Sequence, residues 1–455
     1  MTKDLLGSKL RPLFFTLFAS ALGSTLITTV YSTVDIICIG HHSGPQATAA
    51  LSCLNPLWSM MFAPGLLVGI GGSVMMSNRK AAGRMDEANA YFTLSAVLAM
   101  IFSAIVSLSF IFFPRELITF FGADSEEVLN YGVTYMRPVG FASSTFTMCA
   151  CLATFMRNDG EAFTPTVATA IGGAINIFLD VFLVFGLDLG VFGAGLATSI
   201  AQAIAFAIVA AYFFRKKCAL KFTKIHNLWH KFFAICTLGS SAFVLELATM
   251  VTVTVFNRII MSSLGENHLA VYGTSATLTI MYFCLFNAIG TALQPLASSA
   301  FGAEKHARVR EVLNLSLVLS VVFGAVFLVL SHLFPGAILK MYMDVNDEVM
   351  AIGPRILRIY TTSIAMTGIS ILCTFYFQAV LRRGFSLIIS VLRALVLPIG
   401  LVMAIPALFG IDALWWSIPI AEAITCLAAL AMLIYDKRKM GRLISVLQSP
   451  EEIKV

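Results

Sequence analysis

Charged side chains are scarce in this chain: they make up 12% of its 455 residues, whereas hydrophobic residues make up 58%. A soluble domain carries roughly 25% charged residues, which cover its surface. The mean hydropathy is +0.89, and apolar runs recur along nearly the whole length. Because one bilayer crossing needs about 20 mostly apolar residues, the chain has room for about twelve crossings and for no separate soluble domain.

Several catalytic and metal-binding patterns are also missing. The sequence contains no phosphate-binding loop, so ATP hydrolysis is excluded as the energy source. Its nine cysteines form no Cys-x-x-Cys pair, which excludes the common zinc and redox motifs. His41 and His42, placed at a predicted loop, and the pair His226 and His230 lack acid or cysteine partners, so we expect exposed histidines there instead of a metal site. We therefore expect neither an enzyme nor a bound cofactor.

Basic residues are concentrated in alternate connections between the apolar runs. These connections include Arg79, Lys80, Arg84, Arg157, Lys305, Arg308, Arg382, Arg383, Lys437, Arg438 and the basic stretch 215–231. The other connections hold mainly acids such as Asp124 and Asp344. The positive-inside rule then predicts an even number of spans, with both termini on the cytoplasmic side of a bacterial-type inner membrane. The net charge of +6 is thus a topology signal, and no nucleic-acid partner is expected.

Twelve spans are predicted, six on each side of the basic stretch. They cover residues 12–39, 47–77, 91–113, 130–155, 163–186, 190–214, 232–262, 268–299, 312–334, 351–380, 385–409 and 411–435. We therefore divide the chain into an N-terminal lobe (1–214), a cytoplasmic linker (215–231) and a C-terminal lobe (232–455).

The two halves resemble each other at residues that a chance similarity of apolar runs does not explain. Phe113-Pro114 recurs as Phe334-Pro335, and Gly190 recurs as Gly410. Six spans per half is an even number, so both halves begin on the same side of the membrane. The predicted fold class is an all-α polytopic membrane protein with twelve transmembrane helices in two pseudo-symmetric six-helix lobes and a cavity between them.

Four acids within the predicted spans stand out: Asp35, Asp180, Glu246 and Glu422. Inserting an acid into hydrocarbon costs about 2.5–3.5 kcal/mol, so each is a functional candidate. Asn176 precedes Asp180 by four residues, and on a helix the two side chains share one face.

Two hydroxyl groups in neighbouring predicted spans, Thr198 and Tyr135, would complete an oxygen-rich site with Asp180. Carboxylate, amide and hydroxyl oxygens suit a proton or Na⁺. Two nearby acids cannot both stay ionised without a counter-ion, so the site is expected to take up a cation. The alternative interpretation of Asp180 is a hydrogen-bonded acid that packs helices together.

Motifs in a fixed order carry a resemblance to a known family. They are Val34-Asp35-Ile36-Ile37-Cys38-Ile39-Gly40, Gly71-Gly72-Ser73, Arg157-Asn158-Asp159-Gly160, Asn176-Ile177-Phe178-Leu179-Asp180, Gly190-Val191-Phe192-Gly193-Ala194-Gly195-Leu196-Ala197-Thr198, Gln294-Pro295 and Phe377-Gln378-Ala379. Over essentially its full length the chain resembles the multidrug and toxic compound extrusion (MATE) transporters. The resemblance implies the MATE-type fold and extrusion of amphipathic organic compounds against Na⁺ or H⁺. It also implies a cation site at Asp35, Asn176, Asp180 and Thr198, with Tyr135 beside it.

The chain departs from the family in its first and tenth spans. No proline lies between Pro12 and Pro45, where many relatives have one that bends the first helix. The tenth span has no acid, so a second cation site that one branch of the family builds there with an acid of the seventh helix is incomplete. Glu246 therefore either contacts cationic substrates or pairs with Arg393. Glu422, where relatives often have Asp, and Arg393 are further candidate substrate residues.

The leading function is that of a monomeric cation-coupled antiporter that exports amphipathic cationic organic compounds. Its expected partners are these small molecules and the lipid bilayer, with H⁺ or Na⁺ as coupling ion. A flippase for lipid-linked precursors is the alternative, but the buried charges in the clearer positions are acids, which disfavours a pyrophosphate group. A sensor or channel without active transport is less favoured, because the chain has no soluble output domain.

Overall fold

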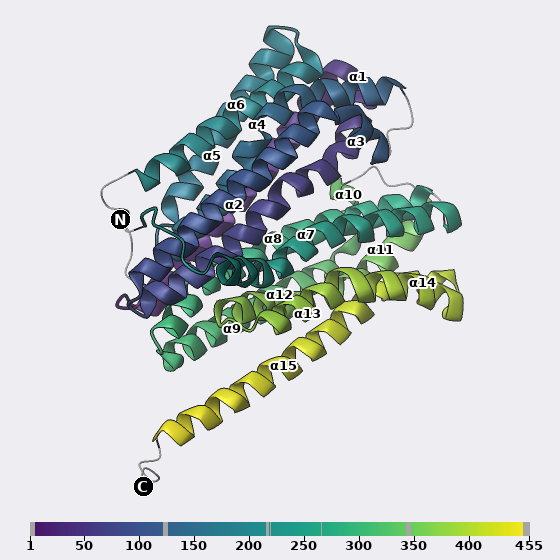
Figure 1. Ribbon diagram of the computed structural model, residues 1–455. Coiled ribbons are helices and arrows are strands. Elements are labelled where there is room, and N and C mark those ends of the chain that lie inside the picture. The colour runs from purple at the N-terminus through teal and green to yellow at the C-terminus, as the bar shows by residue number, and fades with distance from the viewer. Residues whose placement is uncertain are drawn as a thin grey trace, which may run out of the picture.

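The structure, a computed structural model, describes residues 5–121, 126–214, 218, 220–264, 266–342 and 347–448, and within these ranges all regular elements are helices. Figure 1 shows two bundles, which we call the first and second lobes. The first lobe comprises α1 (Leu10–Ala81), α2 (Met85–Phe112), α3 (Pro114–Phe120), α4 (Glu126–Asn158), α5 (Phe163–Asp180), η1 (Val181–Gly186) and α6 (Gly190–Phe213). The second comprises α7 (Leu228–Ser263), α8 (Glu266–Gly302), α9 (His306–Leu333), α10 (Pro335–Tyr342), α11 (Asp347–Thr361), α12 (Ile364–Ala379), α13 (Arg383–Val391), η2 (Leu392–Val396), α14 (Leu397–Phe409), η3 (Ile411–Trp416) and α15 (Ser417–Gln448).

The repeated Phe-Pro motif builds the same element in each lobe. Phe113 and Phe334 each end a 28-residue helix, and the following proline begins a short one, α3 or α10. Proline is well suited to the first turn of a helix, where its missing N–H is not needed. The predicted similarity between the halves is therefore confirmed at the level of local structure.

Eleven helical segments in the described part of the chain are long and apolar enough to cross a bilayer. Helix α8, with 37 residues, is long enough for a twelfth crossing. The predicted span 351–380 agrees with the candidate crossing Met350–Ala379, in which a turn at Thr362 and Ser363 separates α11 from α12. Helix α7 begins at Leu228, so the last residues of the predicted linker are helical. Residues 215–217 and 219 of that linker lie outside the described residues.

Helix α1 contains two predicted spans and folds back on itself. Near its two ends, Ser20 donates a 2.6 Å hydrogen bond to the Ala162 carbonyl, and Ser73 accepts one of 3.1 Å from Asn158, so both ends lie at the α4–α5 connection. Two interior residues of α1, Asp35 and Trp58, both lie instead against Tyr135 of α4. The chain therefore reverses direction between residues 35 and 58. The predicted loop at His41 and His42 is wrong, because the backbone stays helical there.

The lobes meet at the end of the molecule that holds the α4–α5 connection and the linker, which we call the linker end. Ser77 and Asn158 of the first lobe form hydrogen bonds with Ser298 and Ser299 of the second, at 2.8–3.2 Å. We call these four buried residues the polar seam. The backbones also touch: a Cβ on Gly239 of α7 would lie 1.8 Å from the Leu67 carbonyl oxygen of α1.

Candidate functional site

The structure brings the five predicted residues of the first lobe into one cluster, formed by Asp35 of α1, Tyr135 of α4, Asn176 and Asp180 of α5, and Thr198 of α6. The Tyr135 hydroxyl donates a 2.9 Å hydrogen bond to Asp35 Oδ2 and lies 3.4 Å from Thr198 Oγ1. The Asn176 amide donates to the same Thr198 oxygen at 3.3 Å. Asp180 follows one turn later on the face of Asn176. All five side chains are buried, and we call them the first-lobe cluster.

The cluster contains more acceptor oxygens than donors. Among the described residues, both carboxylate oxygens of Asp180, one of Asp35 and the amide oxygen of Asn176 are buried without a hydrogen-bond partner. Leaving a buried polar group unpaired costs about 1–3 kcal/mol, and more for a charged group. A cation bound among these oxygens removes that cost. Hard oxygen ligands are the type that Na⁺ prefers, and a proton bound to a carboxylate is the other solution.

Local backbone features give the cluster its shape. A Cβ on Gly195 would lie 2.5 Å from the Tyr135 carbonyl oxygen, so glycine there lets α6 approach α4 closely and brings Thr198 to Tyr135. Helix α5 changes to the wider π-helix η1 directly after Asp180. Single π-helical turns within α-helices occur often at functional sites, because the local widening changes the direction of side chains.

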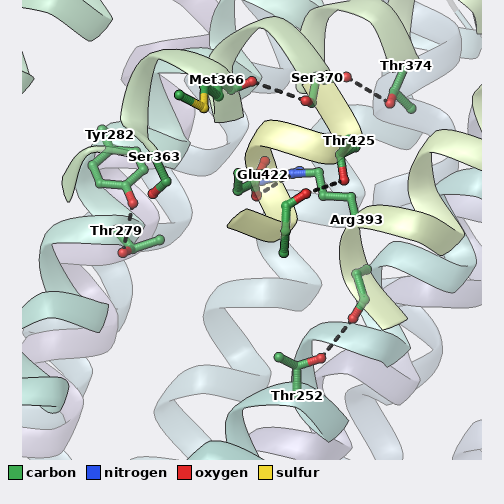
Figure 2. A network of polar contacts seen from close by, with 12 residues as sticks. Thr252, Thr279, Tyr282, Ser363, Met366, Ser370, Thr374, Arg393, Glu422 and Thr425 are labelled. Carbon is green, nitrogen blue, oxygen red and sulfur yellow. Dashed lines mark hydrogen bonds and ion pairs between the residues drawn. The ribbon is translucent and has the colours of Figure 1, made fainter. Parts of the chain in front are cut away.

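The second lobe holds a buried ion pair, seen in Figure 2 between η2 and α15. Arg393 Nε lies 2.9 Å from Glu422 Oε1, and the guanidinium carbon lies 5.2 Å from the centre of the Phe283 ring. Nearby, Thr252 of α7 donates to the Ala394 carbonyl oxygen of η2 at 2.8 Å. The partner of Arg393 is thus Glu422. The interpretation in which Glu246 pairs with Arg393 is therefore wrong.

Glu246 lies at the boundary with the first lobe. Its carboxylate accepts a 3.3 Å hydrogen bond from Ser59, which belongs to the part of α1 after the reversal. Of the two interpretations of Glu246, contact with cationic substrates is the one that agrees with this position between the lobes. It stays a prediction.

Three further ion pairs could not be predicted from the sequence. His42 lies 2.8 Å from Asp188, so the expectation that it lacks an acid partner is wrong. At the linker end, Lys80 pairs with Asp159, and Arg382 lies 2.6 Å from Asp436. These partners are between 54 and 146 residues apart in the chain, so spacing does not reveal them.

The fold and the cluster define a polytopic helical membrane protein with two related lobes and a buried acidic site in one of them. The profile of the MatE family matches residues 21–182 and 242–403, one stretch in each lobe. The chain belongs to this family of transporters.

Curated relatives cover nearly the whole chain. The multidrug export protein MepA of Staphylococcus saprophyticus is 25% identical, with 90% of each chain covered. The probable multidrug resistance protein YoeA of Bacillus subtilis is 22% identical, covering 92% of this chain and 93% of its own.

Solved structures agree with the fold. The MATE multidrug transporter DinF-BH superposes with a TM-score of 0.88 at 25% identity, covering 96% of this chain and 98% of its own. An outward-facing MATE family transporter of the MOP superfamily gives a TM-score of 0.86 at 18% identity, covering 98% and 100%.

Proposed function

We propose that the protein exports amphipathic organic cations across the cytoplasmic membrane in exchange for H⁺ or Na⁺. Family membership and the names of the MepA relatives support multidrug export. One observation carries the ion coupling: the unpartnered buried oxygens of Asp35, Asn176 and Asp180. In this proposal the protein works as a monomer with both termini in the cytoplasm.

The first-lobe cluster gives each residue a role in the exchange. Tyr135 orients Asp35 through its hydroxyl donor, and Asn176 orients Thr198, which leaves the free carboxylate oxygens for the ion. Without a cation, the two buried carboxylates repel each other and three of their four oxygens lack a donor, so a closed, water-free cluster is costly. Ion and substrate then compete by favouring different conformations of the lobes.

The energetics of such an exchange are sufficient. Exchange of one monovalent organic cation for one H⁺ or Na⁺ moves no net charge. A tenfold ion gradient, worth about 1.4 kcal/mol, therefore supports a tenfold substrate gradient.

Proteoliposomes with an imposed pH or Na⁺ gradient and a fluorescent lipophilic cation test the proposal. Asp180→Asn keeps the side-chain shape but removes its charge, and it should abolish gradient-driven transport, as should Asp35→Asn. Asp188→Asn is the matched control, because this acid lies near the same helix with its side chain 88% exposed. Uphill transport at the unmodified rate by a folded Asp180→Asn protein would refute the coupling role. The gradient that drives transport identifies the ion.

A further inference from the structure

The surroundings of the Arg393 guanidinium in the second lobe have a recognisable chemistry. A carboxylate oxygen of Glu422 lies 2.9 Å from Nε on one side, and the Phe283 ring lies 5.2 Å from the guanidinium carbon on another. A carboxylate combined with an aromatic face binds delocalised organic cations, because both contribute negative potential without requiring a small, hydrated ion. Arg393 therefore occupies a site of the kind that suits an organic cation.

Arg393 does not use the full hydrogen-bonding capacity of this site. One hydrogen bond, from Nε, joins the pair, whereas an arginine that binds a carboxylate firmly commonly uses two parallel donors. The second carboxylate oxygen of Glu422 is buried and has no hydrogen-bond partner among the described residues. Arg393 also lies on the π-helix η2, and the carbonyl of the next residue, Ala394, accepts a hydrogen bond from Thr252 of α7.

We propose that Glu422 and Phe283 form a binding site for a delocalised organic cation, and that Arg393 is a tethered competitor that fills this site when no substrate is bound. The proposal rests on the proposed function, since it names the class of compound exported. Glu422 is paired with a cation both before and after substrate binding. The second lobe therefore needs no coupling ion, whereas the first-lobe cluster does.

Equilibrium binding of tetraphenylphosphonium to the purified full-length protein in nanodiscs tests the proposal. Arg393→Met removes the competitor and keeps much of the side-chain volume, so binding should tighten roughly tenfold or more, as expected when a blocked fraction of sites is released. Glu422→Gln and Phe283→Leu should each weaken binding. The double variant Arg393→Met with Glu422→Gln should show no gain, because the attracting charge is gone.

Three outcomes would overturn the proposal. The first is unchanged or weaker tetraphenylphosphonium binding by a folded Arg393→Met protein. The second is an equal gain in affinity for neutral triphenylphosphine oxide, which would mean that the substitution only enlarged the site. If Arg393→Met does not fold, Arg393→Gln also removes the charge and keeps a polar side chain, and binding that does not tighten in this variant is the third outcome. The test is independent of ion coupling, because Asp180→Asn protein, which should not transport, should still show the tighter binding when combined with Arg393→Met.

Discussion

The polar seam should control how strongly the lobes are held together at the linker end. The double variant Ser77→Ala with Ser298→Ala removes the hydrogen bond between Ser77 and Ser299 and the one that the Ser298 hydroxyl donates, to Ser77 or to Asn158. A buried neutral hydrogen bond stabilises the closed conformation by about 1 kcal/mol, after allowance for the hydrogen bonds that water offers when the site opens. The conformation closed at this end should therefore lose about 2 kcal/mol relative to the open one, a shift on the order of 30-fold in population.

Spin labels on the two lobes measure this shift as a distance distribution. Arg84 and Arg310 are exposed positions at the linker end of the first and second lobes, and cysteines there can be labelled in a variant without the native cysteines. Ser103→Ala is the matched control, because this buried serine donates only within its own helix, to the Met100 carbonyl. An unchanged distribution in the double variant, or an equal change in the control, would refute the reasoning.

Three further predictions concern the lobe boundary and the topology. Gly239→Ala should open the linker end more strongly than loss of the polar seam, since the new Cβ would lie 1.8 Å from the Leu67 carbonyl oxygen. The same spin labels would report this opening, and an unchanged closed population would contradict the prediction. Glu246→Gln should reduce export of cationic compounds more than export of neutral ones, as transport assays on matched compounds would show, whereas an equal loss for both would count against the proposed role. Single cysteines at Lys217 and Asp344, which lie outside the described residues, should be labelled from the cytoplasm and the periplasm respectively; labelling of position 217 from the periplasm would reverse the topology.

Interactions along one helix were predictable, and interactions between helices mostly were not. Asn176 and Asp180 share a face of α5 because four residues make about one turn, and this needed only the sequence. By contrast, the choice of Glu422 over Glu246 as partner of Arg393 depends on how α15 and α7 are rotated about their axes. A span that faces lipid on one side and protein on the other is apolar on both sides. Its sequence therefore shows little helical periodicity from which that rotation could be predicted.

The reversal of α1 shows a second limit of sequence reasoning. His41-His42-Ser43-Gly44-Pro45 contains turn-forming residues, and such a run ordinarily predicts a loop. The backbone there is nevertheless helical, because packing of both α1 segments against α4 and α5 outweighs local preference. The π-helices η1 and η2 likewise have no sequence signature that we recognise.

The continuity of α1 has a mechanical consequence. In order along this one helix lie Asp35 of the first-lobe cluster, Ser59 against Glu246, Leu67 against Gly239 of the second lobe, and Ser77 of the polar seam. A displacement at Asp35 reaches these three points of contact with the second lobe only through the reversal of α1 between residues 35 and 58. The stiffness of this reversal would therefore set how much of a movement at Asp35 reaches the second lobe.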